Sequence, residues 1–293
     1  MQSPVSRGTS AGRDHTTSSF TVNGVDLHVE LAGDAGPPLV MVHGGWVDHR
    51  SWRLVAPALA EKHRVVSYDR RGHSASAGPG IRHGSRTQHE ADLAALIEAL
   101  DLGPVHLVGS SYGGSVALAV AANRPDLVRT VVAHEPPLVG VAGLHSSLAD
   151  LLARVSTLLG LVIADLVRGK QERGAIRFIE ELALGPGSWF TLPEAGRRTM
   201  VANAATFLDV VTDPDWGSVP VATDHHVPVL LTDGGVSPRW MPEIVTALLE
   251  TVYVHADRRT YECAGHAPHL THQAEFVETV TSFVLGVDAA LTG

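Results

Sequence analysis

Apolar and polar positions follow two patterns along most of the chain. Short continuous apolar runs, typical of strands buried on both faces, are separated by segments in which apolar residues recur at helical spacing. This alternation predicts an α/β fold, with a mostly parallel sheet and helices on both of its faces. The expected strands are at 38–42, 64–68, 105–108, 130–133, 228–232 and 252–254. The expected helices are at 51–61, 90–100, 112–123, 241–250 and 274–285.

Two segments depart from this alternation. Residues 20–31 form two alternating runs around Asn23 and Gly24, which predicts a β-hairpin. Residues 138–220 contain only helical patterns, and a helical insert at the carboxyl edge of a sheet would cover any site there. We therefore expect a flexible tail at 1–18, a core made of 19–137 and 221–293, and a helical cap at 138–220.

Composition narrows the function classes. The 293 residues are 44% hydrophobic and 18% charged, as in a folded globular chain, and the net charge of −9 argues against nucleic acid as a partner. Because the N-terminal region is polar and no run of about 18 apolar residues occurs, we expect a cytoplasmic protein that does not enter a membrane. The single cysteine, Cys263, excludes an internal disulfide and is expected to be a small buried side chain. The number of subunits stays open.

The segment 109–113 (GSSYG) matches the pattern G-x-S-x-G, with Ser111 at its centre. It lies between an expected strand and an expected helix, where a sharp turn would lift the central hydroxyl above the sheet. The N-terminus of the helix would also direct a positive partial charge at a developing anion. We interpret Ser111 as a nucleophile. The alternative is a glycine-rich connector without chemistry.

A serine nucleophile needs a base, and histidine is the usual one. His266 follows the last expected strand, where a loop could bring it over Ser111, although a surface histidine is the alternative interpretation. His269 and His272 extend the pattern to H-x-x-H-x-x-H, which could suggest a metal. No other residue with ligand character is placed to complete such a site, so we expect neither a metal nor a cofactor.

Four motifs in this order resemble the α/β-hydrolase fold family. They are 43–46 (HGGW), 68–74 (YDRRGHS), 109–114 (GSSYGG) and 265–269 (GHAPH). The resemblance covers nearly the whole chain after the tail. It implies an eight-stranded, mostly parallel sheet with an inserted helical cap, and acyl transfer by a serine triad.

The resemblance also assigns an oxyanion hole. One donor is the backbone N–H of Tyr112, which follows the nucleophile, and the other is expected at Gly45. Such preset donors stabilise the transition state by about 2.7–4 kcal/mol each. Trp46 is expected in the wall of the substrate pocket, although core packing is nearly as plausible for it. The segment 69–71 (DRR) is interpreted as an ion-paired scaffold loop without a catalytic role.

The acid of the triad is where the sequence departs from the family pattern. The family's carboxylate usually lies a few residues into the loop after the strand at 228–232, and Val236 stands at that place. Asp233 is near but precedes the glycines of this loop. Glu135 follows the strand after the nucleophile helix, and some members of this fold take their acid from that position. We favour Glu135 and keep Asp233 as the alternative.

The cap should select the substrate. With few lysines and no basic cluster it favours a neutral small molecule, and we expect a small, largely apolar carboxylic ester or lactone. Two other function classes remain open: a cofactor-free lyase or isomerase, and a ligand-binding protein without turnover. Aromatic residues that could line the pocket are Phe178, Trp189, Phe190, Phe207 and Trp216.

Overall fold

The computed structural model describes residues 15–78, 80–81, 84–220 and 227–292. Its eight-stranded sheet has the strand order β1-β2-β4-β3-β5-β6-β7-β8, in which β2 pairs antiparallel with β1 and β4 and every other pair is parallel. The expected mostly parallel eight-stranded sheet is therefore confirmed. The strands are β1 (His15–Val22), β2 (Val25–Ala32), β3 (Pro38–Val42), β4 (Arg64–Tyr68), β5 (Val105–Ser110), β6 (Val128–His134), β7 (Val229–Gly234) and β8 (Asp257–Tyr261).

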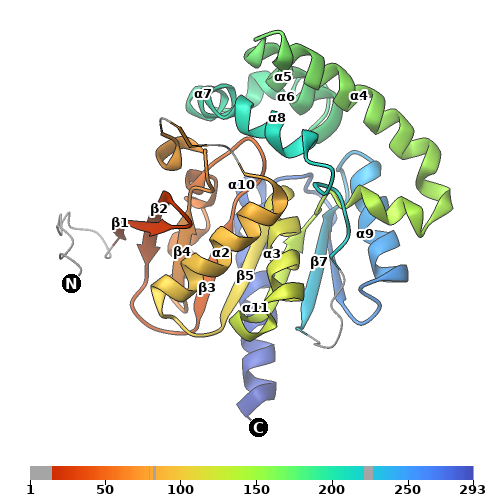
Figure 1. The fold of residues 1–293 in the computed structure, drawn as a ribbon. Helices are drawn as coiled ribbons and strands as arrows, with labels where there is room; N and C mark the ends of the chain where they lie inside the picture. Colours follow the sequence, from red (N-terminus) through yellow and green to blue (C-terminus); the bar gives the residue numbers. More distant parts are fainter. Residues whose placement is uncertain (1–14, 79, 82–83, 221–226, 293) are drawn as a thin grey trace.

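Helices cover both faces of this sheet (Figure 1). Because successive side chains of a strand point to opposite faces, Val40 and Val42 of β3 join one core cluster while Leu39 and Met41 join the other. The first cluster includes α2, α3 and α9, and the second includes η1, α1 and α11. The bounds are η1 (His49–Trp52), α1 (Ala56–Leu59), η2 (Ser74–Ser76), α2 (Arg86–Leu100), α3 (Tyr112–Asn123), η3 (Pro125–Leu127), α9 (Trp240–Thr251), α10 (Pro268–Thr271) and α11 (Gln273–Thr292).

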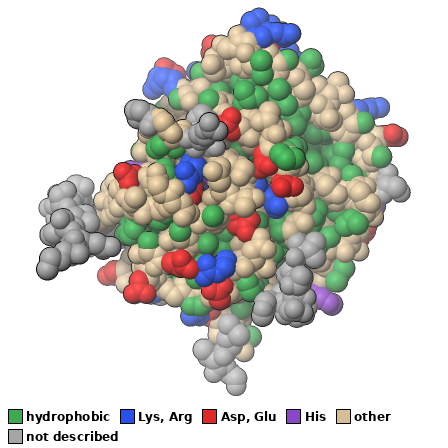
Figure 2. Space-filling view, viewed as in Figure 1, with side chains coloured by type: hydrophobic (Ala, Val, Ile, Leu, Met, Phe, Trp, Pro, Cys, Tyr) green, Lys and Arg blue, Asp and Glu red, His purple; other side chains and the backbone are tan. Residues whose placement is uncertain are grey.

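The described residues between β6 and β7 form helices and no strand, and we call 139–212 the helical segment. It lies beyond one end of the sheet, at the top of Figure 1, and has its own apolar cluster, which Trp46 and Met241 of the core join. Figure 2 shows apolar side chains gathered on the upper part of the molecule. The elements are η4 (Val139–Gly143), η5 (Ser146–Leu148), α4 (Ala149–Val167), α5 (Gln171–Arg177), η6 (Phe178–Ala183), α6 (Ser188–Thr191), α7 (Glu194–Ala202) and α8 (Ala204–Thr212).

The structure corrects two strand assignments. The strand expected at 252–254 is wrong, because these residues follow α9 and the N–H groups of Val252 and Tyr253 bond back to Leu248 O. The last strand is β8, whose first three residues are exposed at the sheet edge and therefore lack an apolar pattern. At the other edge of the sheet, residues 15–18 pair with β2 and are not part of a tail. Backbone hydrogen bonds hold this part of β1, so it needs no alternating apolar pattern that the sequence could reveal. Residues 1–14 of the expected tail lie outside the described part of the chain.

The expected helix at 51–61 is two short helical turns, η1 and α1. Asp48 caps η1 by accepting a hydrogen bond from Arg50 N, and α1 begins afresh at Ala56 with Pro57 in its first turn. Within the described residues, no helix is long and apolar enough to cross a membrane.

Candidate active site

Ser111 occupies a strained turn between β5 and α3. Its backbone has φ 53° and ψ −128°, a region that non-glycine residues rarely adopt. The turn needs small neighbours: a Cβ on Gly109 would lie 2.5 Å from Gly113 O, and one on Gly113 would collide with Val42 O. The Ser111 N–H donates to His134 O (2.8 Å), which fixes the turn to the end of β6. The strand-to-helix turn expected from the sequence is thus present.

Glu135 lies beside the same turn and reaches His266. Its Oε2 is 2.6 Å from His266 Nδ1, and its Oε1 accepts from Gly234 N at 2.9 Å. Glu135 also has a positive φ of 43°, immediately after β6. Because Glu135 accepts at Nδ1, the Nε2 atom of the neutral ring is left as the proton acceptor.

Asp233, the alternative acid, points elsewhere. Its side chain is fully buried at the end of β7, and its Oδ2 accepts from Arg258 Nε at 3.0 Å. Val236, at the family's usual acid position, is 65% exposed. Of the two carboxylates considered, Glu135 is therefore the one that the fold brings to His266.

The surroundings of Glu135 favour its charged form. Burial alone would raise the pKa of this carboxyl, but His134 and the hydrogen bond from His266 outweigh it and lower the pKa to about 2. Burial lowers the pKa of His134 to about 4, so this ring is neutral at pH 7 and adds little positive charge beside Glu135. The hydrogen bond from His266 is therefore the main cause of the low pKa of Glu135. No pattern in the sequence singled out His134, which packs against both Glu135 and His266.

Ser111 and His266 both line one cavity of about 710 Å³. Gly45, Trp46 and Tyr112 line it as well, so the structure gathers the expected oxyanion donors and the expected wall residue around the same space. The opposite wall comes from the helical segment and is largely apolar. Its residues include Val155, Leu159, Phe178, Ile179, Leu182, Leu192, Met200, Phe207 and Val210.

The aromatic residues expected in the wall are divided by the structure. Phe178 and Phe207 line the cavity and pack against Trp46, at centroid distances of 5.3 and 4.4 Å from its ring, and Trp216 lines the cavity too. Trp189 is instead buried in the core of the helical segment, and Phe190 is 74% exposed; neither lines the cavity. Both belong to α6, a single helical turn whose sides could not be told apart from the sequence.

Trp240, His269 and Cys263 are among the lining residues that were not expected from the sequence. The ring of His269 packs against Trp52 (4.6 Å between centroids), and burial lowers the pKa of His269 to about 3. Cys263 is exposed, so the expectation of a buried thiol was wrong. It follows β8, the edge strand, in a turn.

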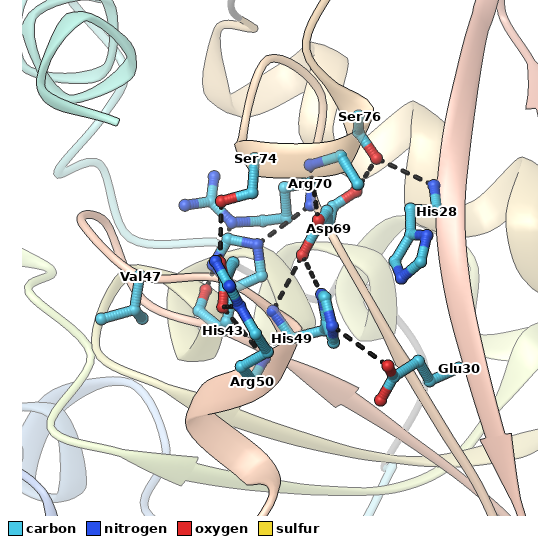
Figure 3. A network of polar contacts seen from close by, with 12 residues as sticks. His28, Glu30, His43, Val47, His49, Arg50, Asp69, Arg70, Ser74 and Ser76 are labelled. Carbon is cyan, nitrogen blue, oxygen red and sulfur yellow. Dashed lines mark hydrogen bonds and ion pairs between the residues drawn. The ribbon is translucent and has the colours of Figure 1, made fainter. Parts of the chain in front are cut away.

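The loop that carries Gly45 is held by Arg70, which lies next to His43 in Figure 3. This guanidinium is 1% exposed and donates to His43 O (3.2 Å) and to Gly44 O (2.9 Å). Its Cζ also lies 5.0 Å from the centre of the Tyr112 ring. Burial lowers the pKa of Arg70 to about 10, which keeps it charged at neutral pH. The DRR segment thus supports this loop, as expected of a scaffold.

A second polar network lies next to it, at the edge between β2 and η1 (Figure 3). The buried carboxylate of Asp69 accepts from His49 Nδ1 at 2.6 Å, and His49 Nε2 lies 3.2 Å from Glu30 Oε1. Burial lowers the pKa of His49, but the two carboxylates outweigh it and raise the pKa to about 10. His49 is therefore a cation between two anions.

Three groups in the described residues have donor atoms close enough to share an ion. They are His28, Glu30 and His49; Asp48, His49 and Asp69; and His134, Glu135 and His266. Members of each group already bond to one another, as the networks above show. In the described part of the chain, His266, His269 and His272 do not form such a group with one another.

Residues 39–279 match the sequence model of the alpha/beta hydrolase family. The chain belongs to this family. A 2-hydroxymuconate semialdehyde hydrolase of Pseudomonas sp. (strain CF600) is 27% identical over 272 residues, which cover 87% of this α/β-hydrolase and 89% of the relative. A dihydrolipoyllysine-residue acetyltransferase component of the acetoin cleaving system of Pseudomonas putida is 37% identical, but only over 41% of this chain and 30% of that protein.

Solved structures show the same fold. A carboxylesterase of Bacillus subtilis superposes with a TM-score of 0.71 at 20% identity, covering 93% of this chain and 92% of its own. A haloalkane dehalogenase of Bradyrhizobium elkani gives a TM-score of 0.71 at 19% identity, covering 94% of this chain and 100% of its own. Because proteins with different reactions share this architecture, the fold does not select among them.

Proposed function

We propose that this α/β-hydrolase is a serine hydrolase that cleaves a small, largely apolar carboxylic ester or lactone through an acyl-enzyme. Ser111 is the nucleophile, His266 the base and Glu135 the acid that orients the base. The observation that carries the proposal is the 2.6 Å bond between Glu135 Oε2 and His266 Nδ1, at a cavity that Ser111 also lines.

In acylation, Ser111 Oγ attacks the ester carbonyl carbon while His266 Nε2 takes the hydroxyl proton. The carbonyl oxygen becomes an oxyanion, to which the N–H groups of Gly45 and Tyr112 donate. The C–O bond of the ester then breaks, and His266 returns the proton to the departing alkoxide. The products of this half-reaction are a free alcohol and an ester of Ser111.

In deacylation, water attacks the acyl carbon as His266 Nε2 removes its proton. Collapse of the second tetrahedral intermediate breaks the bond to Ser111 Oγ, which recovers its proton from His266. Glu135 stays ionised throughout, which suits a carboxyl whose pKa is lowered to about 2. It stabilises the imidazolium that forms twice in each cycle.

The cavity supports an apolar substrate. Its wall in the helical segment is largely aliphatic and aromatic, and Arg50, which also lines it, is already paired with Asp48. Among the described lining residues the other arginine, Arg53, is exposed, so desolvation of a charged substrate would not be offset by a buried arginine. The neutral ester or lactone expected from the sequence therefore remains the preferred class.

A second candidate rests on the match to the 2-hydroxymuconate semialdehyde hydrolase, which spans most of both chains. Hydrolysis of such a semialdehyde would use the same nucleophile and base. Its charged substrate would need a cation at the cavity, and Arg53, an exposed lining residue, is in place to supply one. Arg53→Gln should raise KM for that substrate and leave KM for a neutral ester unchanged.

The test compares wild type and Ser111→Ala on p-nitrophenyl esters of two to eight acyl carbons and on 2-hydroxymuconate semialdehyde. We expect Ser111→Ala to lower kcat/KM by about 10⁴-fold or more, without a change in melting temperature. A serine-reactive phosphonate should label the wild type at Ser111 and fail to label the variant. Ester hydrolysis that survives in Ser111→Ala, or a phosphonate that labels neither protein, would contradict the proposal.

A further inference from the structure

The main chain of the loop at 43–47 is held by side chains at successive positions. Arg70 donates to the carbonyl oxygens of His43 and Gly44, and a side chain from the helical segment reaches those of Trp46 and Val47. In a planar trans peptide, the C=O of one residue and the N–H of the next point in opposite directions. The bond to Gly44 O therefore fixes the direction of the Gly45 N–H. The contacts to Trp46 O and Val47 O hold the rest of the loop in place.

The side chain from the helical segment is Asn203, at the junction of α7 and α8. Its Nδ2 donates to Val47 O (3.2 Å) and lies 3.5 Å from Trp46 O, while its Oδ1 accepts from Ser74 N at 3.0 Å. The residue is 2% exposed. The orientation of the amide follows from its partners, because carbonyl oxygens require the NH₂ group and a backbone N–H requires the oxygen.

Neighbouring residues of the helical segment contact η1, His73 and the loop at 43–47. Thr199 Oγ1 accepts from Arg50 Nη2 at 3.1 Å, and Thr206 Oγ1 lies 2.9 Å from His73 Nε2. The ring of Phe207 is so near Gly45 that a Cβ there would come within 3.3 Å of it. This edge of the helical segment therefore meets the expected oxyanion loop directly, and Asn203 is its buried polar contact.

Resting on the proposed function, we propose that Asn203 is a positioning residue for the oxyanion hole. It couples the helical segment to the loop through the carbonyl oxygens of residues 46 and 47. Arg70 sets the direction of the Gly45 N–H through Gly44 O, and Asn203 holds the peptides that follow Gly45. Without the amide donor those peptides can move, and the Gly45 N–H is displaced from the oxyanion. Since the oxyanion exists only in the tetrahedral states, the loss falls on kcat and spares substrate binding.

The experiment compares Asn203→Ala and Asn203→Asp with the wild type on the best p-nitrophenyl ester. The aspartate keeps the size of the side chain and an acceptor for Ser74 N, but it has no donor for the two carbonyls. We expect both variants to lower kcat by about 10- to 100-fold, with KM within about threefold of wild type. Thr212→Ala, on the same α8 but bonded only within that helix, is the matched control and should keep wild-type kcat.

Rates are taken per site titrated with the phosphonate, so that misfolded molecules do not count. The rate of phosphonylation, which also passes through an oxyanion, should fall with kcat, whereas inhibition by an unreactive alcohol should not change. The inference is overturned if Asn203→Asp keeps wild-type kcat, or if KM rises while kcat stays. If the ester hydrolysis of the wild type depends on Ser111, either of those results leaves the proposed function intact. A wild type that neither hydrolyses esters nor reacts with the phosphonate overturns both the proposed function and the role of Asn203.

Discussion

The two halves of the cavity wall are built in different ways. On the side of the sheet, Ser111 and Glu135 are held by backbone geometry: positive φ angles, a bond from Ser111 N to His134 O, and glycines that leave no room for a Cβ. On the side of the helical segment, the wall is made of side chains in an apolar cluster. A position fixed by backbone geometry tolerates few substitutions, whereas an apolar cluster tolerates many substitutions that keep its volume roughly constant.

This contrast indicates that the sheet side of the wall should determine the reaction rate and that the helical segment should determine the choice of substrate. A displacement of the reacting groups by about 1 Å can cost 100-fold in rate, and the sheet side is where positions are fixed that closely. A methylene more or less in an apolar pocket is worth only about 1–3 kcal/mol. Substitutions on the two sides should therefore differ in size and in the kinetic constant that they change.

The largest effect after loss of the nucleophile is expected on the sheet side, at Glu135. Glu135→Gln removes the charge that stabilises the imidazolium of His266, and we expect kcat to fall by about 10³- to 10⁴-fold. Asp233→Asn breaks the ion pair with Arg258 and should lower stability but keep kcat within a few-fold of wild type. Steady-state kinetics of both variants checks this. A large loss confined to Asp233→Asn would mean that the acid comes from β7.

The next effect concerns stability in acid. Although burial raises the pKa of Glu135, its histidine neighbours, above all the bond from His266, lower this pKa to about 2, below the ordinary value of 4.5, so the ionised form stabilises the folded state. That contribution, up to about 3 kcal/mol, is complete above pH 4.5 and is lost as pH falls towards 2. Glu135→Gln should therefore show a shallower fall of melting temperature between these pH values.

The control for this acid titration is Glu250→Gln. Glu250 is paired with His145 at the surface and lies away from the cavity, so its replacement should leave the slope of melting temperature against pH as in the wild type. Equal slopes for wild type and Glu135→Gln would show that the Glu135 carboxylate does not stabilise the fold.

The smallest effect is expected on the side of the helical segment. Phe178→Ala enlarges the cavity next to Trp46, and we expect the preference among p-nitrophenyl esters to move towards longer acyl chains by about 10-fold in relative kcat/KM. Phe190→Ala removes the same ring from an exposed position of the same segment and should change neither preference nor rate. An unchanged preference in Phe178→Ala would mean that the helical segment does not contact the acyl chain.

Much of the sheet could be predicted because its strands are buried on both faces. Those at 38–42 and 64–68 were placed with their observed ends, since each has a β-branched apolar centre and is followed directly by a polar residue, His43 or Asp69. The edge strands could not be placed in this way. β8 begins with Asp257 and two exposed arginines, and its position depends on pairing with β7 rather than on its own pattern.

The candidate site could be predicted where a motif fixes backbone geometry. The pattern around Ser111 implies a strained turn, and the structure has it. Contacts between distant segments could not be predicted: Asn203 reaches Val47 and Ser74 across more than 120 residues, and no local pattern marks it. The same applies to Cys263, whose exposure depends on what the rest of the fold leaves uncovered.

That exposure gives the chain a built-in chemical reporter. The sequence has a single cysteine, and its thiol is exposed at the wall of the cavity that also holds Ser111 and His266. A maleimide dye can therefore be attached at one known place without any engineering. Its rate of attachment would report whether a compound occupies the cavity, even for compounds that are never turned over.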